Sequence, residues 1–192
     1  GRGVTAHLGA GASMCATLGG KSVATTMGFT ALDGLPMGTR SGGIDPGVIF
    51  YLQGEKGMTA DEVEGFLYKK SGLLGISGVS SDMRDLEASD APGARLAIDY
   101  FAYRIVRETG SLAAALGGLD ALVFTAGIGE NSALVREKVC AGLSWLGVEL
   151  DGEANSRNDL VIGTGESRVR VYTIPTNEEL VIAIKTTKMI SA

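Results

Sequence analysis

The chain has 192 residues, of which 45% are hydrophobic and 20% charged, and its formal net charge is −5. A chain of this length can form one sizeable domain that buries on the order of 70% of the surface exposed by the unfolded chain. No apolar run approaches the roughly 20 residues that span a bilayer, and Lys and Arg do not cluster as on surfaces that bind nucleic acid. The composition argues against membrane and nucleic-acid roles.

The first part of the chain is expected to form a small antiparallel unit. Apolar and β-branched residues predict strands over 4–7, 12–18 and 22–26, and Gly19-Gly20 is typical of a tight hairpin turn between the last two. The glycine-rich stretch 28–47 contains too many turn residues for regular structure. Loops of that length are usually functional or mobile.

Helices are predicted next. Asp45-Pro46 favours a helix start, with the helix running through Tyr51, and Thr59 with Glu62 has the spacing of a capping box. We expect a loop over 71–82. A long helix is predicted over 92–116, with charged pairs four residues apart on its outer faces, Arg95 with Asp99 and Arg104 with Glu108, and with an inward face made by Leu96, Phe101, Ile105 and Leu112.

The remaining predicted elements alternate between strand and helix. A continuous apolar run predicts a strand over 121–125, followed by a helix through Val135, Val139 and Leu143. A strand over 169–174 and a final helix from Thr176 complete the order. The sequence therefore predicts an α/β fold without an internal repeat.

The cysteines indicate a cellular compartment, and the first residue indicates whether the chain is part of a longer protein. Cys15 and Cys140 are far apart and form no CxxC motif, which predicts free, reduced thiols. With no signal peptide or disulfide framework, the cytoplasm is the expected compartment. Because the chain starts at Gly1 and enters a buried-type strand at once, we expect it to be a piece of a longer protein.

Two glycine turns are the best indication of function. Residues 7–11 read His-Leu-Gly-Ala-Gly and residues 127–131 read Gly-Ile-Gly-Glu-Asn, and each run follows a predicted strand. Such turns open the backbone to a phosphate, although most Gly-x-Gly pairs are simple hairpin turns. A dinucleotide fingerprint fits poorly, because Ser132 stands where the third glycine belongs. Together the turns predict one nucleotide site, held at its phosphate and adenosine ends.

Single residues near these turns have both structural and functional interpretations. His7, the only histidine, is either a hydrogen-bonded strand residue or a donor to phosphate. Arg40 lies in a glycine-rich loop and is either a surface residue paired with Asp45 or a guanidinium presented to a phosphoryl group. Segment 80–85 is either a helix N-cap through Asp82 or a wall for adenine or ribose.

In the segment 176–179, Thr-Asn-Glu-Glu, the structural and the chemical roles are expected to fall on different residues. Thr176 and Glu179 have capping-box spacing, which leaves Glu178 without a structural task. Glu178 is either a favourable charge at a helix start or a ligand of hydrated Mg²⁺, which typically uses one or two carboxylates with phosphate oxygens.

Taken together, segments 7–13, 27–30, 37–42, 124–132 and 175–179 resemble the acetate kinase family over nearly the whole chain. The match covers that family's C-terminal half, so the resemblance implies that residues 1–192 are a nucleotide-binding lobe and that an N-terminal lobe is absent. The implied fold is one lobe of the sugar kinase, Hsp70 and actin superfamily, a ribonuclease-H-like mixed β-sheet flanked by helices.

The resemblance also implies an activity and residue roles. The family transfers the γ-phosphoryl group of ATP reversibly to a short-chain carboxylate, acetate or propionate, and pairs through this lobe as a homodimer. By resemblance Arg40 is catalytic and Glu178 organises Mg²⁺. The nucleotide would be bound by His7, Leu8, Gly9, Ala10, Gly11, Asp82, Met83, Arg84, Gly127, Ile128, Gly129, Glu130 and Asn131.

The chain departs from the family pattern at a few positions. Ala10 stands where the family usually has Asn, which leaves only backbone donors there, and carboxylates common near Ala24 and Gly43 are absent. We expect these 192 residues alone not to turn over acetate. Alternatives are a propionate or butyrate kinase, a catalytically silent nucleotide-binding module, and a dinucleotide-binding oxidoreductase lobe.

Overall fold

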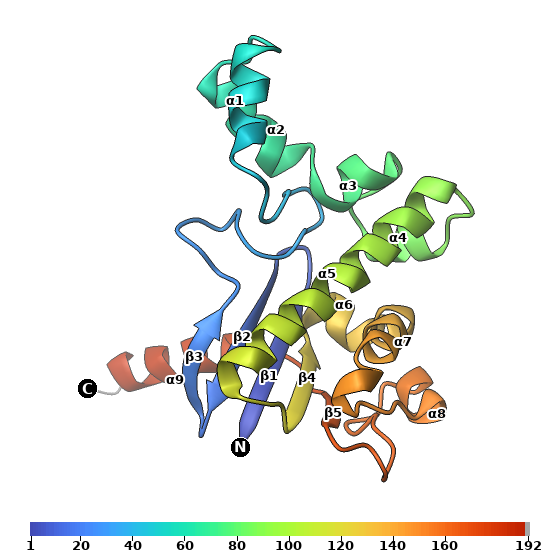
Figure 1. Ribbon diagram of the computed structural model, residues 1–192. Helices are drawn as coiled ribbons and strands as arrows, with labels where there is room; N and C mark the ends of the chain where they lie inside the picture. Colours follow the sequence, from blue (N-terminus) through green and yellow to red (C-terminus); the bar gives the residue numbers. More distant parts are fainter. Residues whose placement is uncertain (191–192) are drawn as a thin grey trace.

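The computed structural model describes residues 1–190, apart from the side chains of Glu178 and Val181. Its centre is one five-stranded mixed sheet in the order β3-β2-β1-β4-β5 (Figure 1). The strands are β1 (Arg2–Leu8), β2 (Ala12–Leu18), β3 (Lys21–Thr25), β4 (Ala121–Thr125) and β5 (Arg170–Thr173). The predicted mixed sheet flanked by helices is confirmed.

The three N-terminal strands form an antiparallel meander, and β4 and β5 add to it in parallel. Gly19 and Gly20 make the turn between β2 and β3 with φ values of +56° and +81°, a conformation that suits glycine. In the parallel pair His7 lies opposite Thr125. This register places the end of β1 beside the end of β4, so the two glycine turns meet at one edge of the sheet.

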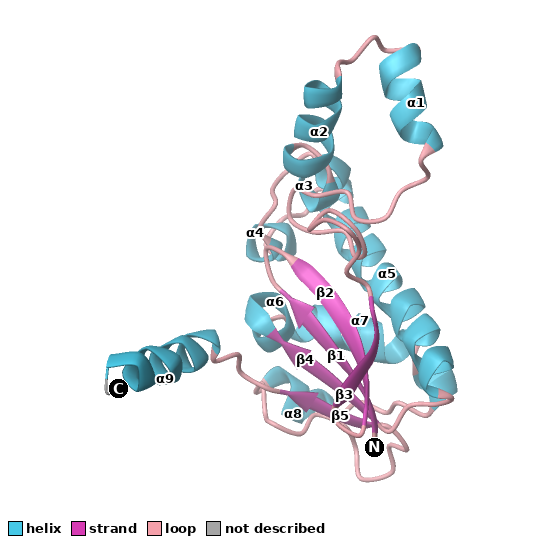
Figure 2. Cartoon of the chain, turned by 90° about the vertical axis from the view of Figure 1, so that its left-hand side faces the viewer, coloured by secondary structure: helices cyan, strands magenta, loops and turns pink. Residues whose placement is uncertain are grey.

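The helices are α1 (Gly47–Gly54), α2 (Ala60–Lys69), α3 (Gly72–Ser77), α4 (Met83–Glu87), α5 (Pro92–Leu116), α6 (Ala126–Asn131), α7 (Ala133–Gly142), α8 (Gly152–Ser156) and α9 (Glu178–Ile190), with a 3₁₀ turn, η1, over Ser144–Leu146. Helix α5 crosses one face of the sheet, and α7 packs beside it (Figures 1 and 2). On β1 and β2 the side chains that face α5 are buried, whereas the alternate side chains, on the opposite face of the sheet, are mostly only partly buried. The core therefore lies between the sheet and α5.

Helix α5 was predicted with its observed bounds. Pro92 is its first residue, and Gly117 ends it in the left-handed region. Phe101, Ile105 and Leu112 are buried as predicted, but Leu96 is 59% exposed. Leu96 was assigned wrongly because the buried stripe passes through Ala94, Ala97 and Ile98 on either side of it.

The charged pairs along α5 are only partly as predicted. Arg104 and Glu108 lie 3.8 Å apart, as expected. Asp99 instead pairs with Lys138 of α7 at 2.8 Å, because the two helices pack together. The ion pair therefore links two helices.

Two local predictions are wrong. Residues 72–77 form α3 within the segment expected to be a loop, because Leu73 is buried and α3 packs on α5. Thr176 does not cap α9: its hydroxyl bonds with that of Thr125, and Asn177 Oδ1 accepts the amide of Leu180 instead. By contrast, the Thr59 capping box of α2 is confirmed.

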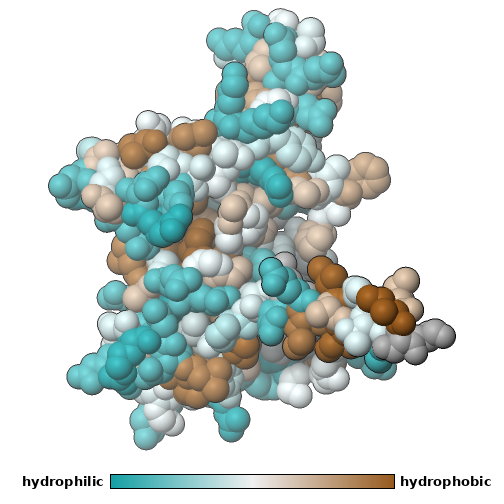
Figure 3. All heavy atoms as spheres, turned by 180° about the vertical axis from the view of Figure 1, so that it is seen from behind, coloured by the Kyte–Doolittle hydropathy of each residue, from teal (hydrophilic) through white to brown (hydrophobic). Residues whose placement is uncertain are grey.

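Two parts project from the body, α1 with α2 at one end and α9 at one side (Figures 1 and 2). None of the residues of α1 is buried. Helix α9 exposes apolar side chains along its length (Figure 3): Leu180, Ile182, Ile184, Met189 and Ile190. Among the helices of residues 1–190, none combines the length and apolar character needed to cross a bilayer.

Candidate functional site

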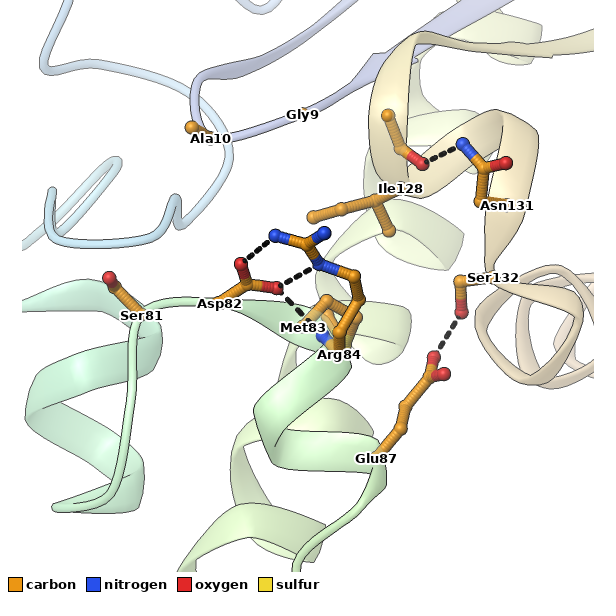
Figure 4. A pocket seen from close by; sticks show the side chains of 11 residues that line it. Gly9, Ala10, Ser81, Asp82, Met83, Arg84, Glu87, Ile128, Asn131 and Ser132 are labelled. Atoms are coloured by element: carbon orange, nitrogen blue, oxygen red, sulfur yellow. Dashed lines mark hydrogen bonds and ion pairs between the residues drawn. The ribbon is translucent and has the colours of Figure 1, made fainter.

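Three segments that are distant in sequence surround one cavity of about 630 Å³, a size typical of small-molecule sites (Figure 4). They are the turn between β1 and β2, helix α4 with the two residues before it, and α6 with the residue after it. The lining residues are Gly9, Ala10, Ser81, Asp82, Met83, Arg84, Glu87, Gly127, Ile128, Asn131 and Ser132.

The turn after β1 forms one end of this cavity. Antiparallel pairing of Leu8 with Ala12 leaves three residues to reverse the chain, and the Gly9 amide donates to the Gly11 carbonyl at 2.9 Å. Gly9, Ala10 and Gly11 carry almost no side-chain atoms, so a ligand can approach the backbone closely.

The start of α4 forms one wall. Asp82 caps the helix by accepting the Arg84 amide at 2.9 Å, as predicted, and its carboxylate also accepts from Arg84 Nη2 at 2.6 Å. These hydrogen bonds, the side-chain one first, lower the pKa of Asp82 to about 2. The Arg84 side chain is 88% exposed, so the wall presents a paired charge to solvent.

Helix α6 forms the opposite wall. The glycine turn predicted over 127–131 is a short helix over 126–131, and its first residue, Ala126, has φ +65°, a conformation uncommon for alanine. Gly129 is buried, and a Cβ added there would lie 3.3 Å from the Phe124 carbonyl carbon. Asn131 Nδ2 donates to the Gly127 carbonyl at 2.9 Å and so stays at the cavity edge.

A buried arginine supports α6 from behind. Arg136 is fully buried, and it donates to the Gly129 carbonyl at 2.9 Å and to Asn155 Oδ1 at 2.7 Å. Burial lowers its pKa, while the nearby Cys140 and Glu87 groups oppose that effect. Arg136 was not singled out from the sequence, although its spacing from Val135, Val139 and Cys140 places it on the buried face of α7.

A second cavity of about 400 Å³ adjoins the first, because Gly127 lines both. Its lining residues are His7, Ala126, Gly127, Glu130, Thr176, Asn177 and Glu179. Glu130 Oε1 accepts the Thr176 amide at 2.8 Å, which ties the α9 entry to α6. The side chain of Glu178 lies outside the described residues, and among those described no group of three or more His, Cys, Asp or Glu residues could hold a metal ion.

Arg40 lies beside the β1–β2 turn. Its Nη1 donates to the Ala31 carbonyl at 3.2 Å, and a Cβ added to Gly11 would lie 3.7 Å from the same nitrogen. Asp45, the alternative partner from the sequence, instead accepts the Gly47 amide at 2.8 Å.

Hydrogen bonds fix the loop that carries Arg40. Helix α3 donates its Leu73 and Leu74 amides to the carbonyls of Met37 and Gly38, both at 2.9 Å. The Gly38 amide donates in turn to the Ala10 carbonyl at 3.1 Å. The loop and the glycine turn are therefore joined directly.

Most residues singled out from the sequence gather around the two cavities. Eight of them line the first: Gly9, Ala10, Asp82, Met83, Arg84, Gly127, Ile128 and Asn131. His7 and Glu130 line the second, Gly11 belongs to the β1–β2 turn, and Arg40 lies beside that turn. Leu8 and Gly129 are buried beneath the surface. The cavity also includes Glu87, which the sequence did not single out.

Several acetate kinases are similar to this chain in sequence. A family model described as the acetokinase family matches residues 2–184. The chain is 60% identical over 190 residues to a protein named acetate kinase from Nitrobacter hamburgensis, covering 99% of this chain and 47% of that one. An acetate kinase from Rickettsia akari is 54% identical over 97% of this chain and 49% of its own.

Solved structures give the same result. The crystal structure of Porphyromonas gingivalis acetate kinase superposes with a TM-score of 0.93 and 43% identity, over 98% of this chain and 49% of that one. A propionate kinase from Francisella tularensis gives 0.90 and 43%, over 94% and 47%. The chain spans about half the length of the curated relatives it matches. Sequence, fold and the family model agree that this chain belongs to the acetokinase family.

Proposed function

We propose that this chain is the nucleotide-binding half of an enzyme that transfers the γ-phosphoryl group of ATP to a short-chain carboxylate, with acetate as the first candidate. The observation that carries this proposal is the cavity of about 630 Å³ in which the β1–β2 turn, the start of α4 and α6 meet. Relatives named acetate kinase at 60% identity support it.

In this proposal the cavity binds the nucleotide lengthwise. Backbone amides of Ala10 and Gly11, with His7 beside them, bind the phosphates, because the Gly9 amide already donates within the turn. Asp82, Met83 and Arg84 on one wall and Gly127, Ile128 and Asn131 on the other enclose the adenosine. Because Ala10 offers no side-chain donor, phosphate binding at that position depends on the backbone alone.

The proposed reaction is an in-line phosphoryl transfer. A carboxylate oxygen of the acid forms a bond to the γ-phosphorus while the bond to the β-phosphate oxygen breaks, and the electron pair leaves with ADP. The transition state asks mainly for positioning and neutralisation of charge. Arg40, fixed beside the glycine turn, would supply both through its planar, permanently charged guanidinium.

Mg²⁺ is the metal we propose for this site, because hydrated Mg²⁺ is commonly held by one or two carboxylates together with phosphate oxygens. Glu178 begins α9 next to the second cavity, whose lining includes Asn177 and Glu179. When bound, the ion would neutralise charge on the phosphates. Glu178 would hold it, and Thr176 would fix the approach of the chain through its hydrogen bonds to β4 and α6.

We further propose that the acyl substrate binds with help from a second, N-terminal lobe, as the length of the relatives suggests, so that these 192 residues alone do not turn over acetate. The exposed apolar side chains of α9 are suited to packing against such a lobe.

We also propose that the protein forms a homodimer through α1 and is located in the cytoplasm. The free thiols of Cys15 and Cys140 fit a reducing compartment.

Propionate is the second candidate acid, because a protein named propionate kinase is as similar to this chain, at 43% identity, as the acetate kinase from Porphyromonas gingivalis. A catalytically silent nucleotide-binding module is the alternative in another class. Arg40 distinguishes a kinase from a silent module, since a module that only binds nucleotide has no use for a guanidinium at the transferring phosphate.

Hydroxamate trapping tests the proposal. The chain is expressed with its upstream coding region and given ATP, Mg²⁺ and acetate, propionate or butyrate, and acyl phosphate is trapped with hydroxylamine. We expect hydroxamate from at least one acid, and the order of yields identifies the substrate. No hydroxamate with any acid, from a folded protein, would refute the kinase proposal.

A further inference from the structure

The carboxylate of Glu87 lies at the end of the first cavity away from the β1–β2 turn. Glu87 is the last residue of α4, and Ser132 is the N-cap of α7. Figure 4 shows Gly9 and Ala10 toward one end, Glu87 with Ser132 toward the other, and the Asp82–Arg84 pair between them.

The hydrogen bonds of Ser132 fix the orientation of this carboxylate. Ser132 Oγ accepts the Val135 amide at 3.0 Å and donates its own proton to Glu87 Oε1. Within residues 1–190 no hydrogen bond is made to Glu87 Oε2. One oxygen of the carboxylate is therefore anchored, and the other can accept a hydrogen bond from a ligand.

The position defines which part of a nucleotide would meet Glu87. If the phosphates bind at Gly9 and Ala10, the sugar and base extend along the cavity past Ile128 and Met83, whose apolar side chains suit a flat ring. The edge of the base that points away from the sugar then faces Glu87. An ionised carboxylate only accepts hydrogen bonds, so it favours a base with N–H groups at that edge.

We propose that Glu87, anchored by Ser132, determines base specificity by accepting a hydrogen bond from an exocyclic amino group such as that of adenine. This inference rests on the proposed function, because it takes the cavity to bind a nucleotide. A base without a donor at that edge would cover the carboxylate without satisfying it, which costs more than the loss of one hydrogen bond.

The test compares two ligands that differ only in the amino group, ADP and purine riboside 5′-diphosphate, by isothermal titration calorimetry. For the unmodified chain we expect ADP to bind roughly 10- to 100-fold more tightly, as for a hydrogen bond to a charged group. Glu87→Ala should bring this ratio close to one. Glu87→Gln, which keeps an acceptor oxygen but loses the charge, should lower it several-fold.

Glu137→Gln is the matched control, since Glu137 is an exposed carboxylate on α7 outside the cavity lining, and its ratio should equal that of the unmodified chain. ADP binding with a ratio near one in the unmodified chain, or a ratio unchanged in Glu87→Ala, overturns this inference alone. Should Glu87→Ala fail to fold, an unchanged ratio in Glu87→Gln decides against it. A folded chain that does not bind ADP overturns the proposed function as well.

Discussion

Arg40 has a permanent positive charge and is held half-buried beside a turn made of glycine and alanine. Replacing it with alanine should lower kcat of the enzyme by roughly 10³-fold, because a guanidinium that stabilises a transferring phosphoryl group contributes on that scale. Release of ADP in a coupled assay measures the effect. The thermal midpoint should stay close to that of the parent, since the side chain loses only a hydrogen bond to the Ala31 carbonyl and a long one to Met37 Sδ.

Arg40→Lys is the companion variant. It keeps the charge but loses the planar fork, so its kcat should fall between those of the parent and of Arg40→Ala. Turnover of Arg40→Ala within a few-fold of the parent would remove Arg40 from the mechanism.

Asp82 gives a prediction about pH. Its pKa is lowered from 3.8 to about 2 by hydrogen bonds from Arg84, so the folded state favours the ionised form. The resulting stabilisation is complete above the unfolded pKa and is lost as the pH falls toward 2. Thermal midpoints of the parent and of Asp82→Asn should therefore differ by a constant amount above about pH 5 and converge between about pH 4 and pH 2. A difference that does not change over that range would contradict the assignment.

Among the elements, those with a long repeating pattern could be predicted from the sequence and the short ones could not. Helix α5 carries 25 residues of helical spacing bounded by proline and glycine, and its bounds were predicted correctly. Helix α3 has six residues, two of them glycine, and forms because it packs on α5. Local propensity contains no information about that contact.

The same distinction applies to the candidate site. Gly9 and Gly127 were found because a glycine turn after a strand is a local signal, and the parallel pairing of β1 with β4 then brings the two turns together. Glu87 and Arg136 gave no such signal. Glu87 is an ordinary exposed residue at a helix end, and it becomes part of the cavity only because α4 lies near the start of α7.

Gly72 at the start of α3 allows a test of how the Arg40 loop is held. It has φ +61°, and an added Cβ would lie 2.1 Å from the Met37 carbonyl oxygen. Gly72→Ala should cost more than the roughly 1–2 kcal/mol of the left-handed backbone alone, because the Met37–Arg40 segment must also move. Urea unfolding measures the stability, and the activity of the enzyme should fall with it.

Gly78 is the control for this substitution. It has φ +64° at the end of the same helix, but an added Cβ would meet no atom within 4 Å. Gly78→Ala therefore carries the backbone cost without the collision. Equal losses of stability for the two variants would show that the contact with Met37 does not matter.

At the scale of the whole molecule, three surfaces have apolar or partly buried side chains without a covering layer among the described residues: the face of the sheet opposite α5, helix α9, and helix α1. Monomeric proteins rarely expose large contiguous apolar patches. If α9 and the open sheet face belong to contacts with a second lobe, α1 is the remaining candidate for contact with a second copy of the chain.

The proposed dimer can be tested at α1. Phe50 is 73% exposed on this projecting helix, and aromatic residues commonly contribute much of the binding energy of an interface. Phe50→Ser should raise the dimer dissociation constant by about 30-fold, which corresponds to a 2 kcal/mol contribution from one central residue. Sedimentation velocity over a concentration series measures the change.

Leu160→Ser is the matched control for Phe50→Ser. Leu160 is also an exposed apolar residue, at 60%, but it lies in the connection between α8 and β5, far along the chain from α1. If α1 forms the interface, only the Phe50 variant should dissociate at concentrations where the parent is dimeric. Dissociation by both variants would indicate a general loss of structure, and a parent that is monomeric at every concentration would contradict the dimer itself. A stable interface buries about 800 Å² per partner. If α1 forms the interface, neighbouring residues of α2, such as the exposed Phe66, must therefore contribute to it as well.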